Sequence, residues 1–266
     1  MRRRIGLGIA GVARSVLRVR RTLVESQIAA SFPERESEWV KVTARGCYRH
    51  FGEELAVLAG GANAIRKALD RIQDPSRAID DLRAIAGDGG SCVIVTGHLG
   101  NWELAGAYVA TSGIKVTAVA RRQRGTFGRR LHAVREGLGL EIVDHDAGAA
   151  PVMRALRSGR CVTLVADQHT RRGAEPLPFL GRPAWTSLGP ARLAQAAGVP
   201  LVFGALVREG EGYIARWVPV PPAALEDPVT GTREWLSYLE RAVQERPEQY
   251  FWFHRRWRHT RNVGET

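Results

Sequence analysis

Cysteine and long hydrophobic runs are both scarce in this chain of 266 residues. The three cysteines, Cys47, Cys92 and Cys161, are widely separated and have no spacing typical of a metal or redox site. They exclude a disulfide framework and indicate reduced core residues of a cytosolic protein. The longest early apolar run, residues 5–13, is about half the roughly 20 residues that cross a bilayer. Arginines interrupt its continuation, so a signal peptide fits poorly and we expect no transmembrane helix.

Lysine is also rare: only Lys41, Lys67 and Lys115 occur among the 39 basic residues, and the others are arginines. The net charge of +12 favours an acidic partner, such as a membrane surface, a nucleic acid or a phosphorylated substrate. The arginines are scattered through every segment and accompany no zinc finger or other nucleic-acid-binding motif, so we expect no specific nucleic-acid partner. A basic protein that binds nucleic acid or anionic membrane without catalysis stays open as the alternative function.

The hydrophobic pattern changes character near residue 89. Residues 3–30, 34–58, 62–72 and 75–86 are expected to be helical, and the first of these helices carries a basic face. Short apolar strands then alternate with helices. Strands are expected at 91–96, 115–120, 140–143, 161–166, 200–206 and 213–220, and helices at 101–111, 126–138, 149–158, 188–197 and 234–246. The pattern predicts an α/β fold with a mostly parallel central sheet covered by helices on both faces and a helical N-terminal segment. We expect one domain over 1–266, with a membrane-associating helical part (1–88) and a catalytic α/β part (89–266).

The stretch TGHLGNWELAG, residues 96–106, places a histidine and a glutamate where the first strand ends. Active sites of parallel α/β sheets gather at this edge. Residues five apart on one helix lie about 140° apart around its axis, so His98 is expected before the helix and Glu103 in its first turn. Gly97 and Gly100 permit the sharp backbone that this needs, and Asn101 is a suitable N-cap. In that geometry Glu103 orients the imidazole and the other ring nitrogen accepts a proton.

Spacing alone leaves a second interpretation open. A histidine in such a place can also be a capping or packing residue, and the helix dipole alone explains a glutamate in a first turn. The chain has no G-x-S-x-G elbow or evident catalytic cysteine, so direct attack by a substrate hydroxyl is the simpler scheme. The triplets DHD at 144–146 and DQH at 167–169 contain metal-ligand residue types without a recognised ligand spacing. We therefore expect no metal and no cofactor.

The stretch GHLGNWE resembles the H-x-x-x-x-[DE] motif of glycerolipid acyltransferases. More closely, it is similar to the bacterial lipid A biosynthesis acyltransferase family, which includes phosphatidylinositol mannoside acyltransferases. QIAASFPERESEW, ADQHTRRGAEPLPFLGRPAWTSLGPARLA and PEQYFWFHRRW resemble further segments of this family in the same order. The resemblance covers the chain from about Gln27 to Trp257. It implies an enzyme, an O-acyltransferase that moves a fatty acyl group from acyl carrier protein or coenzyme A to a hydroxyl of a lipid or glycolipid.

The resemblance also implies roles for single residues. His98 would be the general base and Glu103 its partner, while backbone N–H groups or an arginine would stabilise the oxyanion. Arg121 and Arg135 match arginines of the family, and a phosphate is their natural target. The remaining predicted substrate-binding residues are Asn101, Asp167, Gln168 and Glu175. For each of them a capping, packing or solvated role is the alternative, and the resemblance does not assign the role of Arg255 and Arg256.

The Gram-negative lipid A enzymes of this family usually begin with a membrane-spanning helix, and we expect this chain to have none. Its basic amphipathic start suggests instead a helix lying on anionic lipids, which hold it with about 1 kcal/mol per basic residue near the surface. We therefore expect a peripheral protein on the cytoplasmic face of the bacterial inner membrane.

Overall fold

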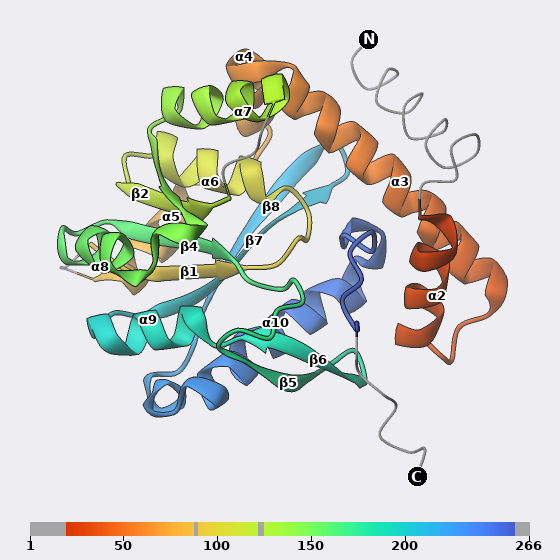
Figure 1. Cartoon of the computed structure of the whole chain (residues 1–266). Coiled ribbons are helices and arrows are strands. Elements are labelled where there is room, and N and C mark those ends of the chain that lie inside the picture. Colours follow the sequence, from red (N-terminus) through yellow and green to blue (C-terminus); the bar gives the residue numbers. More distant parts are fainter. Residues whose placement is uncertain (1–19, 88–89, 122–124, 259–266) are drawn as a thin grey trace.

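A computed structural model of the chain describes residues 20–87, 90–121 and 125–258. A six-stranded sheet in the order β3-β2-β4-β1-β7-β8 forms its centre, and five of the six strands run parallel (Figure 1). The strands are β1 (Val93–Thr96), β2 (Val116–Ala120), β3 (Leu140–Asp144), β4 (Cys161–Val165), β7 (Leu201–Glu209) and β8 (Gly212–Pro219). Only β8 is antiparallel to its neighbour, β7. The α/β fold with a mostly parallel sheet is confirmed.

Helices cover both faces of this sheet, as the pattern predicts. One face carries α4 (Gly61–Leu69), α5 (Pro75–Ala86), α6 (Trp102–Thr111) and α7 (Gly125–Gly137). The other carries α8 (Ala149–Arg157), α9 (Gly189–Ala197) and α10 (Pro228–Glu245). Alternate residues of β1 point to opposite faces, so Val93 and Val95 join one hydrophobic core while Ile94 joins the other. Short 3-10 turns, η1 (His145–Ala147), η2 (Pro222–Glu226) and η3 (Pro247–Gln249), connect the later elements.

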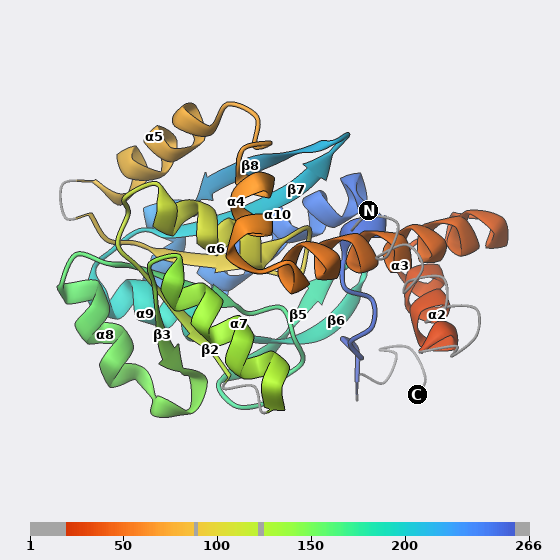
Figure 2. The same cartoon turned by 90° about the horizontal axis from the view of Figure 1, so that it is seen from above.

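The N-terminal helices form a hairpin beside the sheet. Helix α2 (Arg21–Ser31) packs on the long α3 (Ser37–Ala59), and both extend to one side of the α/β part (Figure 2). Their buried residues Val24, Ile28 and Phe32 belong to the same core cluster as Trp235 and Trp252. The helical part therefore shares its core with the α/β part. The expected helix over 3–30 is described only from residue 21, and its earlier residues lie outside the described ranges.

A two-stranded hairpin was not predicted. Strands β5 (Ala174–Phe179) and β6 (Arg182–Ser187) pair antiparallel around a turn at Leu180 and Gly181, which both have positive φ. Prolines at 176 and 178 argue against a strand in a sequence, but this hairpin lies outside the main sheet and tolerates them. The segment PFLGRPAW thus packs Phe179 and Leu180 into the core.

Candidate active site

The loops after β1 and β4 leave the sheet side by side. The last residues of the two strands, Thr96 and Val165, are partners in the parallel register. His98 therefore follows the end of β1 next to Asp167 and Gln168, which follow the end of β4. All three residues thus follow the carboxyl ends of neighbouring strands, and for His98 this is the predicted position.

Two glycines shape the loop that carries His98. A Cβ atom at Gly97 would lie 2.6 Å from Cδ2 of Leu239 and 3.2 Å from Oδ2 of Asp167. Gly100 has a φ of +62°, and a Cβ there would lie only 2.1 Å from the carbonyl oxygen of Leu206. At these two positions the backbone packs against α10 and β7 with no room for a side chain. The loop therefore places His98 next to the carboxylate of Asp167.

His98 makes two hydrogen bonds to Asp167. Its backbone N–H donates to Oδ2 over 2.9 Å, and its Nδ1 lies 2.6 Å from Oδ1. Because an ionised carboxylate only accepts, Nδ1 carries a proton and Nε2 is the free base in the neutral ring. Asp167 is 2% exposed. Burial acts to raise its pKa, but the charge of His98 and the hydrogen bonds from His98 outweigh burial and lower the pKa to about 2.

The imidazole has a different carboxylate partner from the one predicted. Both carboxylate oxygens of Glu103 accept from Arg135, over 2.8 Å from Nε to Oε2 and through a second bond from a terminal nitrogen to Oε1. Among the described contacts, no hydrogen bond joins Glu103 to His98. In the first turn of α6 it is Trp102 that faces His98, with ring centroids 4.7 Å apart, while Glu103 faces α7. The predicted His98–Glu103 hydrogen bond is therefore replaced by the one to Asp167.

The other nitrogen of His98 faces the exposed side of the loop. Nε2 lies 3.2 Å from the amide nitrogen of Gln168, and the His98 side chain is 18% exposed. A weak donor at this distance is easily displaced by a stronger one. A substrate hydroxyl at this position would donate to Nε2 and pass its proton to it.

Aromatic rings surround His98 on its remaining sides. Trp102 and Phe251 contact the imidazole, and Phe51 and Phe253 pack around Phe251. The Phe251 N–H also donates to the carbonyl of His98 over 2.9 Å, which brings the C-terminal segment PEQYFWFHRRW to the site. The four aromatic side chains are only partly buried and form an apolar wall beside His98.

The same C-terminal segment supports Asp167 from behind. Tyr250 is buried and interacts with both Asp167 and Arg256; burial first, then the charge of Asp167, hold its pKa well above its ordinary value. Arg256 is 1% exposed and donates to the carbonyl of Trp185 and the hydroxyl of Thr186. Burial lowers the pKa of this guanidinium, which Tyr250 and Asp167 partly offset. The sequence did not predict this supporting role of Arg256. The neighbouring Arg255 is exposed, whereas Arg256 is buried.

Two of the other predicted residues lie away from the imidazole. Asn101 is 3% exposed; its side chain accepts from Leu104 N–H, as predicted for an N-cap, and donates to Glu54. Asn101 thus supports the loop from beneath. Glu175 is exposed on β5 opposite Thr186, and no described contact joins it to His98.

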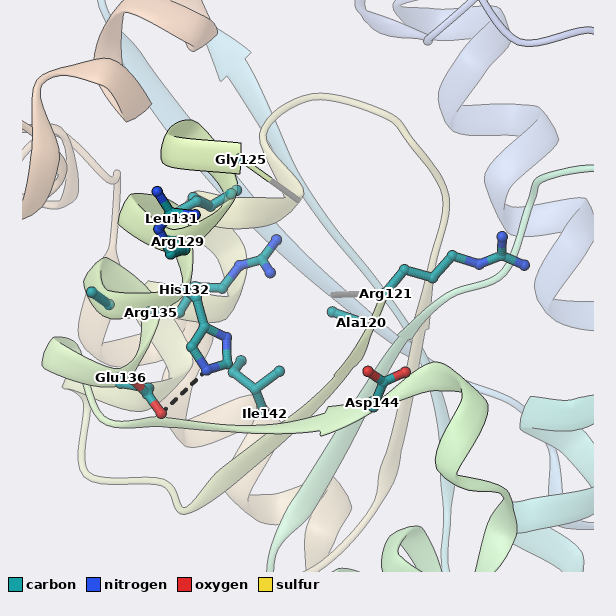
Figure 3. Close-up of a pocket in the computed structure, with 12 residues that line it drawn as sticks. Ala120, Arg121, Gly125, Arg129, Leu131, His132, Arg135, Glu136, Ile142 and Asp144 are labelled. Carbon is teal, nitrogen blue, oxygen red and sulfur yellow. Dashed lines mark ion pairs between the residues drawn. The ribbon is translucent and has the colours of Figure 1, made fainter. Parts of the chain in front are cut away.

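A cavity of about 780 Å³ lies between α7 and the ends of β2 and β3 (Figure 3). Twelve residues line it: Ala120, Arg121, Gly125, Gly128, Arg129, Leu131, His132, Ala133, Arg135, Glu136, Ile142 and Asp144. The two arginines predicted to bind substrate, Arg121 and Arg135, are thus brought to one cavity. His98 is not among the lining residues, but Arg135 connects the cavity to Glu103 on α6.

Comparison with known proteins places the chain in a family. Residues 1–259 match the family model described as bacterial lipid A biosynthesis acyltransferase. The chain belongs to this family. It is 28% identical over 170 residues to a phosphatidylinositol mannoside acyltransferase of Mycobacterium tuberculosis (strain CDC 1551 / Oshkosh), covering 62% of this chain and 53% of the relative.

Further relatives match over shorter stretches. A phosphatidylinositol mannoside acyltransferase of Mycolicibacterium smegmatis is 30% identical over 53% of this chain and 48% of its own length. The lipid A biosynthesis palmitoleoyltransferase of Escherichia coli (strain K12) is 29% identical over 43% of this chain and 39% of its own length. The chain spans about half the length of the mycobacterial relatives that it matches.

Neither a spanning helix nor a metal-binding cluster occurs in the described part of the chain. Within residues 20–87, 90–121 and 125–258, no helix combines the length and apolar character that a bilayer crossing requires. The same residues contain no group of three or more histidine, cysteine, aspartate or glutamate side chains placed to hold a metal ion.

Proposed function

We propose that this protein transfers a fatty acyl group from an acyl thioester to a hydroxyl of a lipid or glycolipid, with His98 as the general base. The observation that carries the proposal is the bond between Asp167 and Nδ1 of His98, which leaves Nε2 basic on the exposed side of the loop. Membership of the acyltransferase family supplies the reaction class.

The reaction needs two proton transfers, to and from His98, and the replacement of the thioester sulfur by the acceptor oxygen at the carbonyl carbon. Nε2 accepts the proton of the acceptor hydroxyl as its oxygen attacks the thioester carbonyl. The tetrahedral intermediate then collapses, the C–S bond breaks, and the imidazolium returns the proton to the departing thiolate. Asp167 stabilises the imidazolium because it is ionised and bonded to Nδ1. The ester and the free thiol of acyl carrier protein or coenzyme A are the products.

Side chains around the dyad suit the two substrates. The aromatic wall of Trp102, Phe251, Phe51 and Phe253 would lie against the acyl chain next to the thioester. Gln168 would supply a donor to the developing oxyanion, and Arg121 and Arg135 would supply donors to polar groups of a substrate. We assign Glu103 the task of fixing Arg135 through their paired hydrogen bonds.

Among acceptors, a glycolipid is favoured. The mycobacterial relatives are named for phosphatidylinositol mannosides and the enterobacterial ones for lipid A, both of which carry sugar hydroxyls. An acceptor held in a membrane, together with the basic residues around positions 2–21, supports a peripheral location on the cytoplasmic face of the inner membrane.

Mass spectrometry of total lipids tests the proposal. Cells expressing the wild type should accumulate a lipid that has gained one acyl chain, and cells expressing His98→Ala should not. The purified variant should lose about 10²- to 10⁴-fold in thioester turnover while unfolding at the temperature of the wild type. His145→Ala, which removes an exposed histidine on η1, is the matched control and should behave as the wild type. A folded His98→Ala variant with full turnover would remove the mechanism.

A further inference from the structure

The proposed reaction uses the loops after β1 and β4, but it leaves the cavity beside α7 without an occupant. Its wall contains side chains that neither the predicted site nor the proposed mechanism includes, above all Arg129 and His132. Figure 3 shows His132 on α7 beside Ile142 of β3, and a dashed line joins it to Glu136, with Nε2 3.4 Å from Oε1. Arg121 follows β2 and its side chain extends away from α7. The cavity has the size of a small-molecule site.

Half of the twelve lining residues are charged or titratable, and cations predominate. Three arginines, Arg121, Arg129 and Arg135, stand against the carboxylates of Glu136 and Asp144. Arg135 is engaged by Glu103. Among the described ion pairs none includes Arg121 or Arg129, and the described hydrogen bond of Arg129 is a long one, 3.4 Å to the hydroxyl of Thr126. Within the described residues these two guanidinium groups form no ion pair, although the charge of Arg121 helps to lower the pKa of Asp146.

These features favour a polar anionic ligand over an acyl chain. A hydrocarbon chain would cover the charged groups without replacing their hydrogen bonds to water, which is costly. A phosphate would accept bidentate hydrogen bonds from free guanidinium groups. The amino-terminal end of the 13-residue α7 adds a favourable dipole, since Gly125 lines the same cavity. Glu136 and Asp144 suit ligand hydroxyls, which donate.

The strand order fixes how far such a ligand lies from the base. Strand β2 lies next to β4, and β4 next to β1. Neighbouring strands are about 4.8 Å apart, so the end of β2 at Arg121 is one spacing from the loop of Asp167 and about 10 Å from the loop of His98. A group bound at Arg121 and Arg129 can therefore belong to a substrate whose reacting atom is at His98.

We propose that this cavity binds the phosphate-bearing polar group of a substrate, with Arg121, Arg129 and His132 as its contacts. The inference rests on the proposed function and adds a binding site to it. The phosphate comes either from the head group of the acceptor, with its reacting hydroxyl about 5–10 Å away, or from the phosphopantetheine arm of the donor. Both sources have the same chemistry, and the experiment separates them.

Two soluble probes stand for the two sources. Binding of myo-inositol 1-phosphate represents an acceptor head group, and binding of coenzyme A represents the donor. Each is titrated by NMR into the full-length protein at fixed ionic strength, for the wild type, Arg129→Ala and Arg130→Ala. Arg130 is the matched control, because it follows Arg129 on α7, is exposed and does not line the cavity.

We expect one probe to bind with a dissociation constant that rises about tenfold in Arg129→Ala, which corresponds to about 1.4 kcal/mol. Arg130→Ala should leave it unchanged, and Arg121→Ala should repeat the effect of Arg129→Ala. Weaker binding of inositol phosphate to Arg129→Ala would assign the cavity to the acceptor, and weaker binding of coenzyme A would assign it to the donor.

Equal losses in Arg129→Ala and Arg130→Ala would show attraction by the basic surface as a whole and overturn the proposal, as would failure of both probes to bind the wild type. The readout is independent of turnover. His98→Ala should bind the probe as the wild type does. A wild-type protein that binds the probe but transfers no acyl group would refute only the proposed reaction.

Discussion

The Nδ1 atom of His98 lies 2.6 Å from Oδ1 of Asp167, although 69 residues separate them along the chain. The two loops meet because β1 and β4 are neighbouring parallel strands that end in register. Their carboxylate–imidazole pair has the geometry of a general base with an orienting acid. Glu103, five residues from His98, serves Arg135 instead.

The roles of the two carboxylates separate in their conservative variants. Asp167→Asn keeps the size of the side chain but removes the charge that stabilises the imidazolium, so thioester turnover should fall by about 10²-fold or more. The dependence of activity on pH should also differ from that of the wild type, because the variant lacks the carboxyl whose pKa is lowered to about 2 beside the imidazole. Steady-state rates measured across pH on purified protein provide both readings.

Glu103→Gln is the comparison for Asp167→Asn. This variant should retain the pH profile of the wild type and change mainly the affinity for the substrate, because it releases Arg135. A shift of the pH profile in Glu103→Gln but not in Asp167→Asn would show that Glu103, and not Asp167, orients the imidazole of His98.

A buried ionic cluster around Glu54 packs against the loop that carries His98 and hydrogen-bonds to Asn101. Glu54, 4% exposed, accepts from Asn101 over 2.5 Å, from Arg208 over 2.5 and 2.9 Å and from Tyr213 over 3.0 Å. Glu54→Ala leaves the Arg208 guanidinium without its main partner in a protein interior. Breaking a buried pair in this way costs about 3–5 kcal/mol, which urea unfolding would measure.

Glu38→Ala is the control for Glu54→Ala. Glu38 also lies on α3 and also pairs with an arginine, Arg45, but its side chain is 65% exposed. An exposed pair contributes about 0–1 kcal/mol. Equal losses of unfolding free energy in the two variants would mean that the cluster does not hold the loop.

Acid should destabilise the protein through His254, which is half-buried, and His50, which is buried. Burial lowers the pKa of His254 from 6.5 to about 4, and burial also lowers the pKa of His50. The unfolded chain therefore binds protons as the pH falls from about 6.5 to 4 while the folded His254 stays neutral. The unfolding free energy must fall over this interval.

His254→Gln isolates this contribution, because glutamine keeps an acceptor for the His169 N–H but does not titrate. The difference in unfolding free energy between pH 7 and pH 4.5 should be smaller in His254→Gln than in the wild type. His145→Gln, at an exposed position, should keep the full difference. The interpretation fails if all three proteins lose the same free energy.

Local sequence determined more of the fold than of the site. The strand and helix pattern after residue 89, the N-cap at Asn101 and the edge position of His98 follow from short-range periodicity and turn chemistry. The order of the strands does not follow from local sequence, and the partner of His98 depends on that order. Asp167 reaches His98 only because β4, rather than β2, pairs with β1. The β5–β6 hairpin was not predicted for another reason: its prolines contradict strand propensity. Arg129 and His132 are three residues apart on α7, so the predicted helix already places them on one face, but no pattern in the sequence shows that this face lines a cavity.

The loop between β1 and α6, which carries His98, depends on the close contact of Gly100 with β7. Gly100→Ala places a methyl group 2.1 Å from the carbonyl oxygen of Leu206 at a φ of +62°, so the loop must move away from β7. That movement breaks the bond from Asn101 N–H to the same carbonyl, 2.9 Å long, and displaces His98. We expect a protein that unfolds at markedly lower denaturant concentration and has little turnover. Gly113→Ala is the control, because Gly113 also has a positive φ, +83°, but a Cβ there meets nothing within 4 Å. Its cost should be limited to backbone strain of about 1–2 kcal/mol, with turnover retained. If Gly100→Ala were as stable and active as Gly113→Ala, the close contact with β7 would not be what sets the position of the base.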